Sequence, residues 1–223
     1  MNTYIVKRVV ADAIPALSNT WDDPVWQQAD TAQLGWAWPG TEGSLPTVEA
    51  RLLHDGHTIY GIYRVQDHSV LARVNQFNGQ VCRDSCVEFF FRPRPGAGYM
   101  NLEMSASGAF LCYFIRNHRR TKNGFEDFEA LPAEQGKKIS TLGTTGLVPM
   151  EDVRDQTWQM RFQLPCAIPE LYLGPLGDLS GQTWTGNFYK CGDDLQHPHW
   201  MAWQGVPELN FHLPDSFGTF CFA

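Results

Sequence analysis

Apolar and polar residues alternate along several short stretches of the chain, a pattern typical of strands that bury one face. In the stretch 87–91, VEFFF, apolar side chains occupy the odd positions, and in 99–105, YMNLEMS, they occupy the even positions. Further β-prone runs occupy 109–115, 158–164, 187–191 and 218–222. The pattern therefore predicts a chain built from many short strands.

Turn signals separate these runs. The segments TVEARLL and TIYGIYRV flank Asp55-Gly56, a dipeptide typical of a tight hairpin turn. Other breaks are rich in Pro and Gly, and no amphipathic helical period is sustained over several turns. These features favour an all-β fold, an antiparallel β-sandwich of jelly-roll-like form with few short helices. We expect a single domain over residues 1–223, with residues 16–36 as short helical or irregular cover over one edge.

The charge balance argues against binding to nucleic acid or to an anionic membrane surface. The chain has 24 acidic and 17 basic side chains, a formal net charge of -7, whereas such partners require clustered Lys and Arg. Residues 116–122, RNHRRTK, are locally basic, but the acidic run EDFE follows closely. We therefore interpret 116–122 as a solvated loop.

Two further features concern the compartment. No apolar stretch reaches the roughly 20 residues that cross a bilayer, and Lys7 and Arg8 interrupt the segment that a signal peptide would need to be apolar. We therefore expect a cytoplasmic protein without membrane segments. The six cysteines are scattered without a CxxC pair, which favours buried free thiols in a reducing compartment over a disulfide framework.

A glutamate interrupts each of two neighbouring predicted strands. If both strands bury their apolar faces in one core, Phe89 lies opposite Leu102, because a shift of one residue would turn every side chain to the other face. This register sets Glu88 directly across from Glu103. Like charges in that position are destabilising. A shared proton, a bridging cation or a ligand that donates hydrogen bonds to both must then compensate.

Other polar residues of the predicted sheets could complete a binding surface. Arg161 interrupts the apolar pattern of WQMRFQLP, and Asn101 lies two residues before Glu103. Polar residues also occur together in GNFYKC, namely Asn187, Tyr189 and Lys190. A concave sheet face with these groups is suited to bind a polyhydroxylated ligand. Lys190 or Arg161 would offset the paired carboxylates.

The segment CGDDLQHPHW is a weaker candidate for metal binding. It places His197 and His199 two residues apart and close in sequence to Asp193 and Asp194. Spacing fixes no fourth ligand for a transition metal, so we assign no metal ligand there. The two aspartates leave a calcium site open, although the alternating Asp/Asn/Gly pattern of a dedicated calcium loop is missing.

The order of several segments resembles carbohydrate-binding module family 9, in particular its stand-alone bacterial branch. The similarity runs from about residue 48 to residue 222 and includes LLHDGHTIYGIYRVQD, DSCVEFFFRP, WQMRFQLPCAI, WTGNFYKCGD, HWMAW and NFHLPDSFGTFCF. The resemblance implies a β-sandwich that binds mono- or oligosaccharides without catalysing a reaction, in the context of xylan-type glycan catabolism. Structural calcium ions are also known in the family.

The resemblance also implies roles for individual residues. Glu88 coincides with the family's sugar-binding glutamate, whereas Glu103 stands where those members have an arginine. One of the family's two sugar-clamping tryptophans falls near Val81 or Cys82, and the other falls on Phe211. Phe211 would then be the stacking surface. Trp36, Trp38, Trp200 and Trp203 are candidates to replace the missing tryptophan.

Two other functions stay open at this point. Retaining glycosidases use two carboxyl groups about 5–5.5 Å apart, and opposed Glu88 and Glu103 would meet that distance crudely. The alternative is therefore a glycoside hydrolase, although no serine-hydrolase, phosphate-loop or zincin motif is present. A further hypothesis is that the protein is a scaffold domain that has lost the sugar site.

Overall fold

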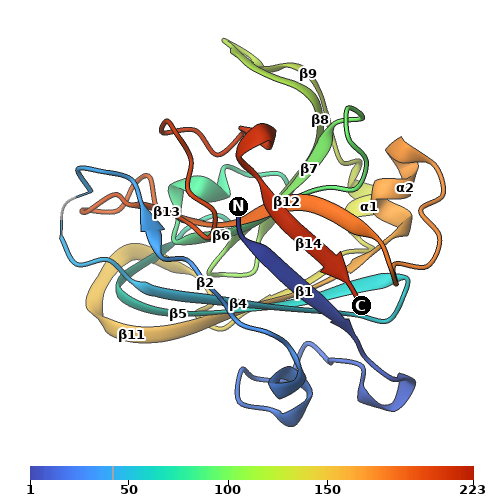
Figure 1. Ribbon diagram of the computed structural model, residues 1–223. Helices are drawn as coiled ribbons and strands as arrows, with labels where there is room; N and C mark the ends of the chain where they lie inside the picture. The colour runs from blue at the N-terminus through green and yellow to red at the C-terminus, as the bar shows by residue number, and fades with distance from the viewer. Residues whose placement is uncertain (42) are drawn as a thin grey trace.

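The computed structural model describes residues 1–41 and 43–223. Strands form two layers (Figure 1), which we call sheet A and sheet B. The main strands of sheet A, in spatial order, are β14 (Gly218–Phe222), β12 (Thr183–Cys191), β6 (Cys86–Arg92), β7 (Tyr99–Ser105), β8 (Phe110–Thr121) and β9 (Gly124–Ala130). The short strands β13 (Trp200–Ala202) and β3 (Trp36–Ala37) extend it beside β12.

Sheet B lies against one face of sheet A. It contains β10 (Ser140–Gly143), β11 (Val148–Pro165), β5 (Thr58–Ala72), β4 (Thr47–His54) and the short β2 (Ala32–Gln33). The first strand, β1 (Thr3–Arg8), joins the two layers, because residues 3–6 pair with β14 and residues 7–8 pair with β4. The sheets are therefore linked along one edge through a single strand.

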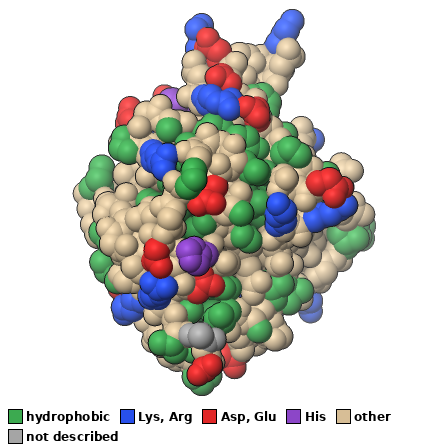
Figure 2. All heavy atoms as spheres, turned by 90° about the vertical axis from the view of Figure 1, so that its right-hand side faces the viewer, with side chains coloured by type: hydrophobic (Ala, Val, Ile, Leu, Met, Phe, Trp, Pro, Cys, Tyr) green, Lys and Arg blue, Asp and Glu red, His purple; other side chains and the backbone are tan. Residues whose placement is uncertain are grey.

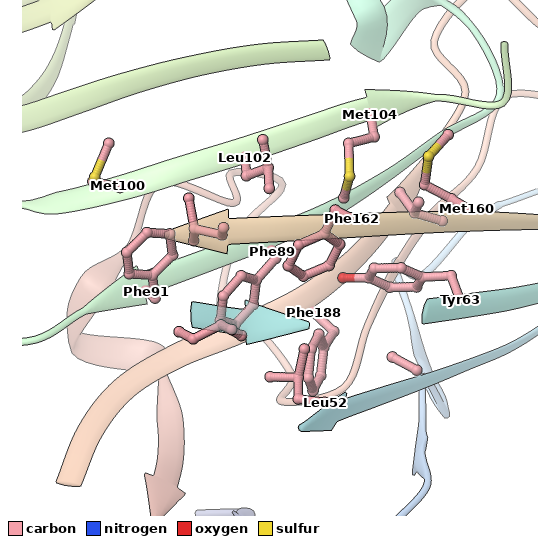
Figure 3. Packing of buried hydrophobic residues seen from close by; sticks show 14 of the residues in the cluster. Leu52, Tyr63, Phe89, Phe91, Met100, Leu102, Met104, Met160, Phe162 and Phe188 are labelled. Carbon is pink, nitrogen blue, oxygen red and sulfur yellow. The ribbon is translucent and has the colours of Figure 1, made fainter. Parts of the chain in front are cut away.

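The main core fills the space between the two sheets. Phe89 of sheet A stacks on Phe162 of sheet B, with ring centroids 5.7 Å apart, and Leu102 and Tyr63 are fully buried beside them (Figure 3). These side chains occupy every second position along their strands, which are the apolar positions of the alternating pattern. The prediction of a β-sandwich is therefore confirmed. Helices are few and short, with α1 at Ala133–Gly136 and α2 at Ala167–Leu173.

A second cluster of apolar side chains covers the outer face of sheet A. It includes Phe90, Tyr189 and Phe217, which are at most 1% exposed. As a result every residue of β7 is buried, those on the outer face included. A central strand of this sheet therefore has no solvated face, and a polar residue there must find a partner inside the protein.

Several local predictions are confirmed. Asp55 closes the turn between β4 and β5 by accepting hydrogen bonds from the backbone N–H groups of His57 and Thr58, and Gly56 has φ +103°. Residues 16–36 contain the predicted short helix, Pro24–Gln28, but with buried Trp21 and Trp26 they cover the outer face of sheet B rather than an edge, and Ala32–Gln33 pairs with β4 as a strand. All six cysteines are free thiols, and four of them are buried.

Two predictions need correction. Residues 116–122 are not a loop: strand β8 continues to Thr121, and with β9 it forms a hairpin that projects from the molecule (Figure 1). The alternation of side chains was hidden there because most of this segment is exposed on both faces. The sandwich is also not purely antiparallel, since β1 runs parallel to β14 and to β4.

Charged side chains of both signs mix over the face shown in Figure 2. Arg116 of the projecting hairpin pairs with Asp127 and Glu129, and Arg119 pairs with Glu126. Two of the basic side chains of this run are thus paired with the opposite strand. In the described part of the chain, no helix is long and apolar enough to cross a membrane.

Candidate functional site: a pocket on the outer face of sheet A

A cavity of about 800 Å³ opens on the outer face of sheet A. Glu88 of β6 and Asn101 and Glu103 of β7 lie at its floor. The remaining lining residues are Gln80, Cys82, Arg83, Leu111, Tyr113, Arg120, Phe125, Cys191, Asp193, Asp194, Trp200, Glu208, Leu209, Asn210, Phe211 and His212. The projecting hairpin and the segments before β6 and after β12 therefore form its walls.

The two glutamates face each other as predicted. In the register of β6 and β7, Glu88 pairs with Glu103 and Phe89 pairs with Leu102. Glu88 is 3% exposed and Glu103 is 7% exposed. Asn101 Nδ2 donates a hydrogen bond of 2.7 Å to Glu103 Oε1, and Cys191 Sγ donates one of 3.2 Å to Glu88 Oε1. Neutral donors therefore serve both carboxyl groups.

Burial favours the protonated form of this pair. Desolvation raises the pKa of Glu103 to about 7, against the hydrogen bond from Asn101 and the positive charge of Arg120. Desolvation and the charge of Glu103 raise the pKa of Glu88 well above its ordinary range. His212 Nε2 lies 4.0 Å from Glu103 Oε1. It is no counter-ion, because burial holds the pKa of His212 well below its ordinary value. Protonation of the carboxyl groups, rather than a counter-ion, is thus the compensation that burial favours.

Aromatic side chains form part of the wall. Phe211 lines the pocket and stacks on Tyr189 behind it, with ring centroids 4.0 Å apart and planes 9° apart. Tyr189 also donates a hydrogen bond from its hydroxyl to the carbonyl of Phe211 at 3.0 Å. Trp200 lines the pocket too, whereas Trp36, Trp38 and Trp203 are not among its lining residues. Cys82 lies at the pocket, near where the family's other tryptophan falls.

Lys190 does not offset the glutamates. It follows Tyr189 in β12, so its side chain points to the other face, into the space between the sheets. Lys190 is fully buried there, and its Nζ lies 3.7 Å from Asp67 Oδ2 and 2.7 Å from His199 Nε2. The side chain of Lys190 therefore pairs with Asp67 inside the core and takes no part in the pocket.

Two other predicted site residues lie away from the pocket. Arg161 of β11 is beneath the N-terminal cover of sheet B, where its Nη2 donates to Gln159 Oε1 at 3.1 Å. Asn187 is buried and binds the backbone of Gln204 through both ends of its amide. Of the eight predicted residues, the structure brings Glu88, Asn101, Glu103 and Phe211 together at the pocket, with Tyr189 directly behind Phe211.

The histidines and aspartates after β12 have structural partners. His199 Nδ1 contacts the carbonyl of His197 at 3.2 Å, and desolvation and the charge of Lys190 lower the pKa of His199 to about 3. Asp193 accepts a hydrogen bond of 2.8 Å from Trp200 Nε1. Asp194 is paired with Arg73 and Arg83. Two carboxylates already held by an indole and two guanidinium groups do not fit a calcium site.

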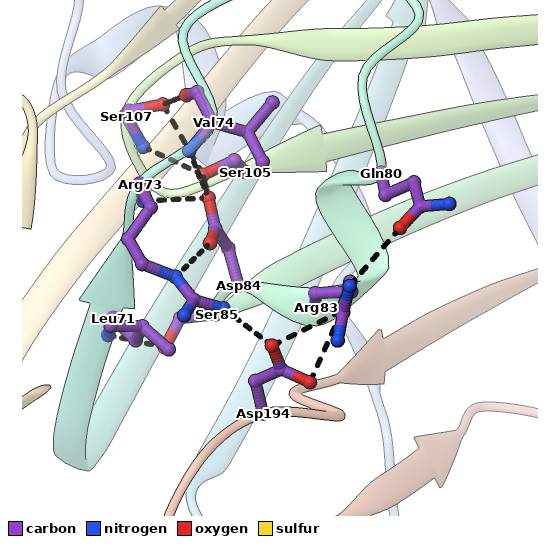
Figure 4. Close-up of polar contacts among 10 residues, drawn as sticks. All are labelled: Leu71, Arg73, Val74, Gln80, Arg83, Asp84, Ser85, Ser105, Ser107 and Asp194. Carbon is purple, nitrogen blue, oxygen red and sulfur yellow. Dashed lines mark hydrogen bonds and ion pairs between the residues drawn. The ribbon is translucent and has the colours of Figure 1, made fainter. Parts of the chain in front are cut away.

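Hydrogen bonds and ion pairs hold the segment before β6, which forms one wall of the pocket (Figure 4). Asp84 is fully buried, and its Oδ2 accepts hydrogen bonds from the backbone N–H groups of Arg73 and Val74 and from Ser105 Oγ, at 2.8–2.9 Å. Asp194, bound to Arg73 and Arg83, ties the segment after β12 to the same wall. The segments before β6 and after β12, which are distant in sequence, are therefore held together at the pocket.

Sequence reasoning missed several lining residues. Arg120 falls in the segment interpreted as a loop, but the hairpin brings it and Phe125 to the pocket, where the Arg120 guanidinium lies 4.3 Å from the centre of the Phe125 ring. His212, bound to the Tyr99 hydroxyl at 2.9 Å, also lines the pocket, and no sequence pattern marks it as a site residue. The one local signal for the hairpin is the turn-forming pair Asn123-Gly124.

Comparisons with known proteins agree with this architecture. A structure from Bacteroides uniformis, described as a presumed carbohydrate-binding protein, superposes with a TM-score of 0.83 at 28% identity and covers 99% of both chains. A carbohydrate-binding module of family 9 from Caldicellulosiruptor kristjanssonii in complex with glucose gives a TM-score of 0.61 at 13% identity, over 100% of this chain and 96% of that chain. The same module in complex with cellotriose gives 0.61 at 13% identity, over 99% and 93%.

A comparison with curated proteins gave no match. The sequence profile of carbohydrate-binding family 9 matches residues 21–222, which is most of the chain and includes every strand that contributes to the pocket floor. The chain therefore belongs to carbohydrate-binding family 9.

Proposed function

We propose that this protein binds a mono- or oligosaccharide, without cleaving it, in the pocket on the outer face of sheet A. The observation that carries the proposal is the combination of hydrogen-bonding groups at the floor, Glu88, Asn101 and Glu103, with the aromatic wall of Phe211 and Trp200. A cavity of about 800 Å³ falls in the range of small-ligand pockets. Family membership supports the same function.

Each group has a role in this proposal. Sugar hydroxyls donate hydrogen bonds to whichever glutamate is ionised, and a protonated glutamate donates one in return. Phe211 and Trp200 offer apolar surface to the C–H groups of a sugar ring. Phe211 is held in place from behind by Tyr189, so the surface is formed before the ligand arrives, which lowers the entropic cost of binding.

A hydrolase is not supported by the geometry. Glu88 and Glu103 are neighbours on adjacent strands at one floor, whereas a glycosidase places its two carboxyl groups on either side of the scissile bond. We therefore expect no hydrolysis of chromogenic glycosides.

Calorimetric titration with glucose, cellotriose, xylose and xylo-oligosaccharides tests the proposal. At least one sugar should bind the wild type, and Glu88→Gln should weaken it about 2-fold to 10-fold, the cost of losing a hydrogen bond between neutral groups, because burial keeps Glu88 protonated. Phe211→Leu should weaken it as well, because the planar ring is lost. Glu134→Gln, at an exposed position of α1 outside the lining residues, is the matched control. The absence of binding to every sugar at millimolar concentration would sink the proposal and favour a scaffold role.

A further inference from the structure

Two cysteines lie at the base of the pocket beside Glu88. Cys86 of β6 and Cys191 of β12 are directly paired across the two strands. Cys86 is two residues before Glu88, so both side chains point to the outer face of sheet A. The two Sγ atoms and a carboxylate oxygen of Glu88 all lie within 4.8 Å of one another, and no residue of the three is more than 3% exposed. Among residues 1–41 and 43–223, no other group of three His, Cys, Asp or Glu side chains is gathered in this way.

We propose that Cys86, Cys191 and Glu88 form a binding site for a thiophilic divalent cation of the Zn²⁺ class. Two sulfur ligands and one carboxylate oxygen are a donor set that Zn²⁺ accepts, and three protein ligands leave a fourth position free. Calcium and magnesium are excluded as occupants, because they require oxygen ligands throughout.

The spacing of the donor atoms fits this cation. With Zn–S near 2.3 Å and Zn–O near 2.0–2.2 Å, tetrahedral coordination places two sulfurs about 3.8 Å apart and a sulfur and an oxygen about 3.5 Å apart. The distance between Cys191 Sγ and Glu88 Oε1 is 3.2 Å, and no pair in the cluster exceeds 4.8 Å. Side-chain rotations therefore suffice, and the paired strands that carry the ligands need not move.

The cation has a path to the site. Glu88 and Cys191 both line the pocket, so the cluster is reached from solvent through it. Binding displaces the two thiol protons and the Glu88 carboxyl proton to solvent, so two thiolates, one carboxylate and the divalent cation leave the site with a net charge of -1. The hydrogen bond that the Cys191 thiol donates to Glu88 in the metal-free protein is lost. A water molecule or a pocket ligand fills the fourth position.

This site does not rest on the proposed sugar binding, although Glu88 belongs to both. The experiment is therefore done with metal alone. Reduced, metal-free protein is titrated with Co²⁺, and the wild type should bind one ion per chain with sulfur-to-cobalt charge-transfer absorption, which Zn²⁺ then abolishes by displacement. Zn²⁺ should also protect Cys191 of the wild type from alkylation, as read by mass spectrometry.

Variants assign the ligands. Cys86→Ser and Cys191→Ser should each lower the affinity for Zn²⁺ by more than the roughly 10-fold to 100-fold that loss of an outer-shell partner costs, and Glu88→Gln should lower it while the charge-transfer band persists. Cys221→Ser, at a partly exposed thiol on β14, controls for adventitious binding to free thiols. Absence of the charge-transfer band in folded wild type, no protection of Cys191, or equal Zn²⁺ affinity in Cys191→Ser and Cys221→Ser would overturn the proposal.

Discussion

Buried ionisable side chains of sheet A are compensated in different ways on its two faces. On the core face, Lys190 lies against Asp67 and His199, so opposite charge and a hydrogen bond compensate for burial. On the outer face, Glu88 meets Glu103, a group of the same sign, and among the described residues no cation lies within ion-pair distance of either carboxyl group, since the nearby His212 is neutral. In the first arrangement the buried charges compensate one another, whereas the second leaves acceptor groups for a ligand.

The pair of glutamates makes stability depend on pH. Burial raises the pKa of Glu103 from 4.5 to about 7, so between these values the folded protein holds a proton that the unfolded chain has released. The free energy of unfolding should be higher near pH 4.5 and fall by up to about 3 kcal/mol as the pH rises through 7. Glu103→Gln should make this fall shallower, as measured by urea denaturation at several pH values. An unchanged slope relative to the exposed control Glu134→Gln would contradict the expectation.

The buried ion pair should show strong coupling. Lys190→Met leaves the Asp67 carboxylate without its cation and should lower the free energy of unfolding by about 3–5 kcal/mol. The double variant Asp67→Asn with Lys190→Met should regain most of that loss, because it removes both charges and keeps the hydrogen bond from Trp158 Nε1. Denaturant unfolding of the wild type, both single variants and the double variant measures the coupling. Additive effects would show that the pair is not an energetic unit.

At the scale of elements, alternation predicted the register of neighbouring strands but not the choice between faces for β12. The apolar positions of β6 and β7 suffice to align Glu88 with Glu103, since only one register buries Phe89 and Leu102 together. In β12, polar atoms point to both faces, from Tyr189 on one side and Lys190 on the other. Because adjacent side chains of a strand point to opposite faces, Tyr189 and Lys190 cannot line the same pocket. The prediction that placed both in the binding site was therefore wrong for Lys190.

The residues that form the walls of the pocket could not be predicted from the sequence, because they come from segments that are distant along the chain. Cys86 and Cys191 are neighbours only through the β6–β12 pairing, and Arg120 reaches the pocket through an exposed hairpin without an apolar period. Local patterns carry no information on which distant segments pair. The floor was therefore predictable from two strands, whereas the walls depend on the topology.

A glycine in the middle of β5 is required by the facing strand. A Cβ atom at Gly61 would lie 2.1 Å from the ring of Phe162 on β11, a contact that the fully formed core cannot relieve without displacement. Gly61→Ala should therefore destabilise the protein by about 1–3 kcal/mol or more. Gly35→Ala, where an added Cβ meets no atom within 4 Å, is the matched control. Equal melting temperatures of the two variants would show that sheet B adapts freely.

For the molecule as a whole, we expect β1 to make the two sheets one cooperative unit. It pairs with β14 of sheet A and with β4 of sheet B, and Tyr4 and Val6 belong to the core that both sheets share. We expect a single unfolding transition in calorimetry, with equal calorimetric and van't Hoff enthalpies. Disruption of the strand by Val6→Pro should lower the melting temperature of both sheets together. Separate transitions for the two sheets would refute this coupling.

The pocket rests on a floor and walls of different origin. Its floor belongs to strands whose register is imposed by the core, whereas its walls come from the β8–β9 hairpin and from connecting segments. Loops accept insertion and exchange far more readily than buried strands. Evolution can therefore alter which ligand this protein selects by replacing peripheral segments while the two glutamates stay in place, and a designer who grafts new walls onto the same floor can do the same.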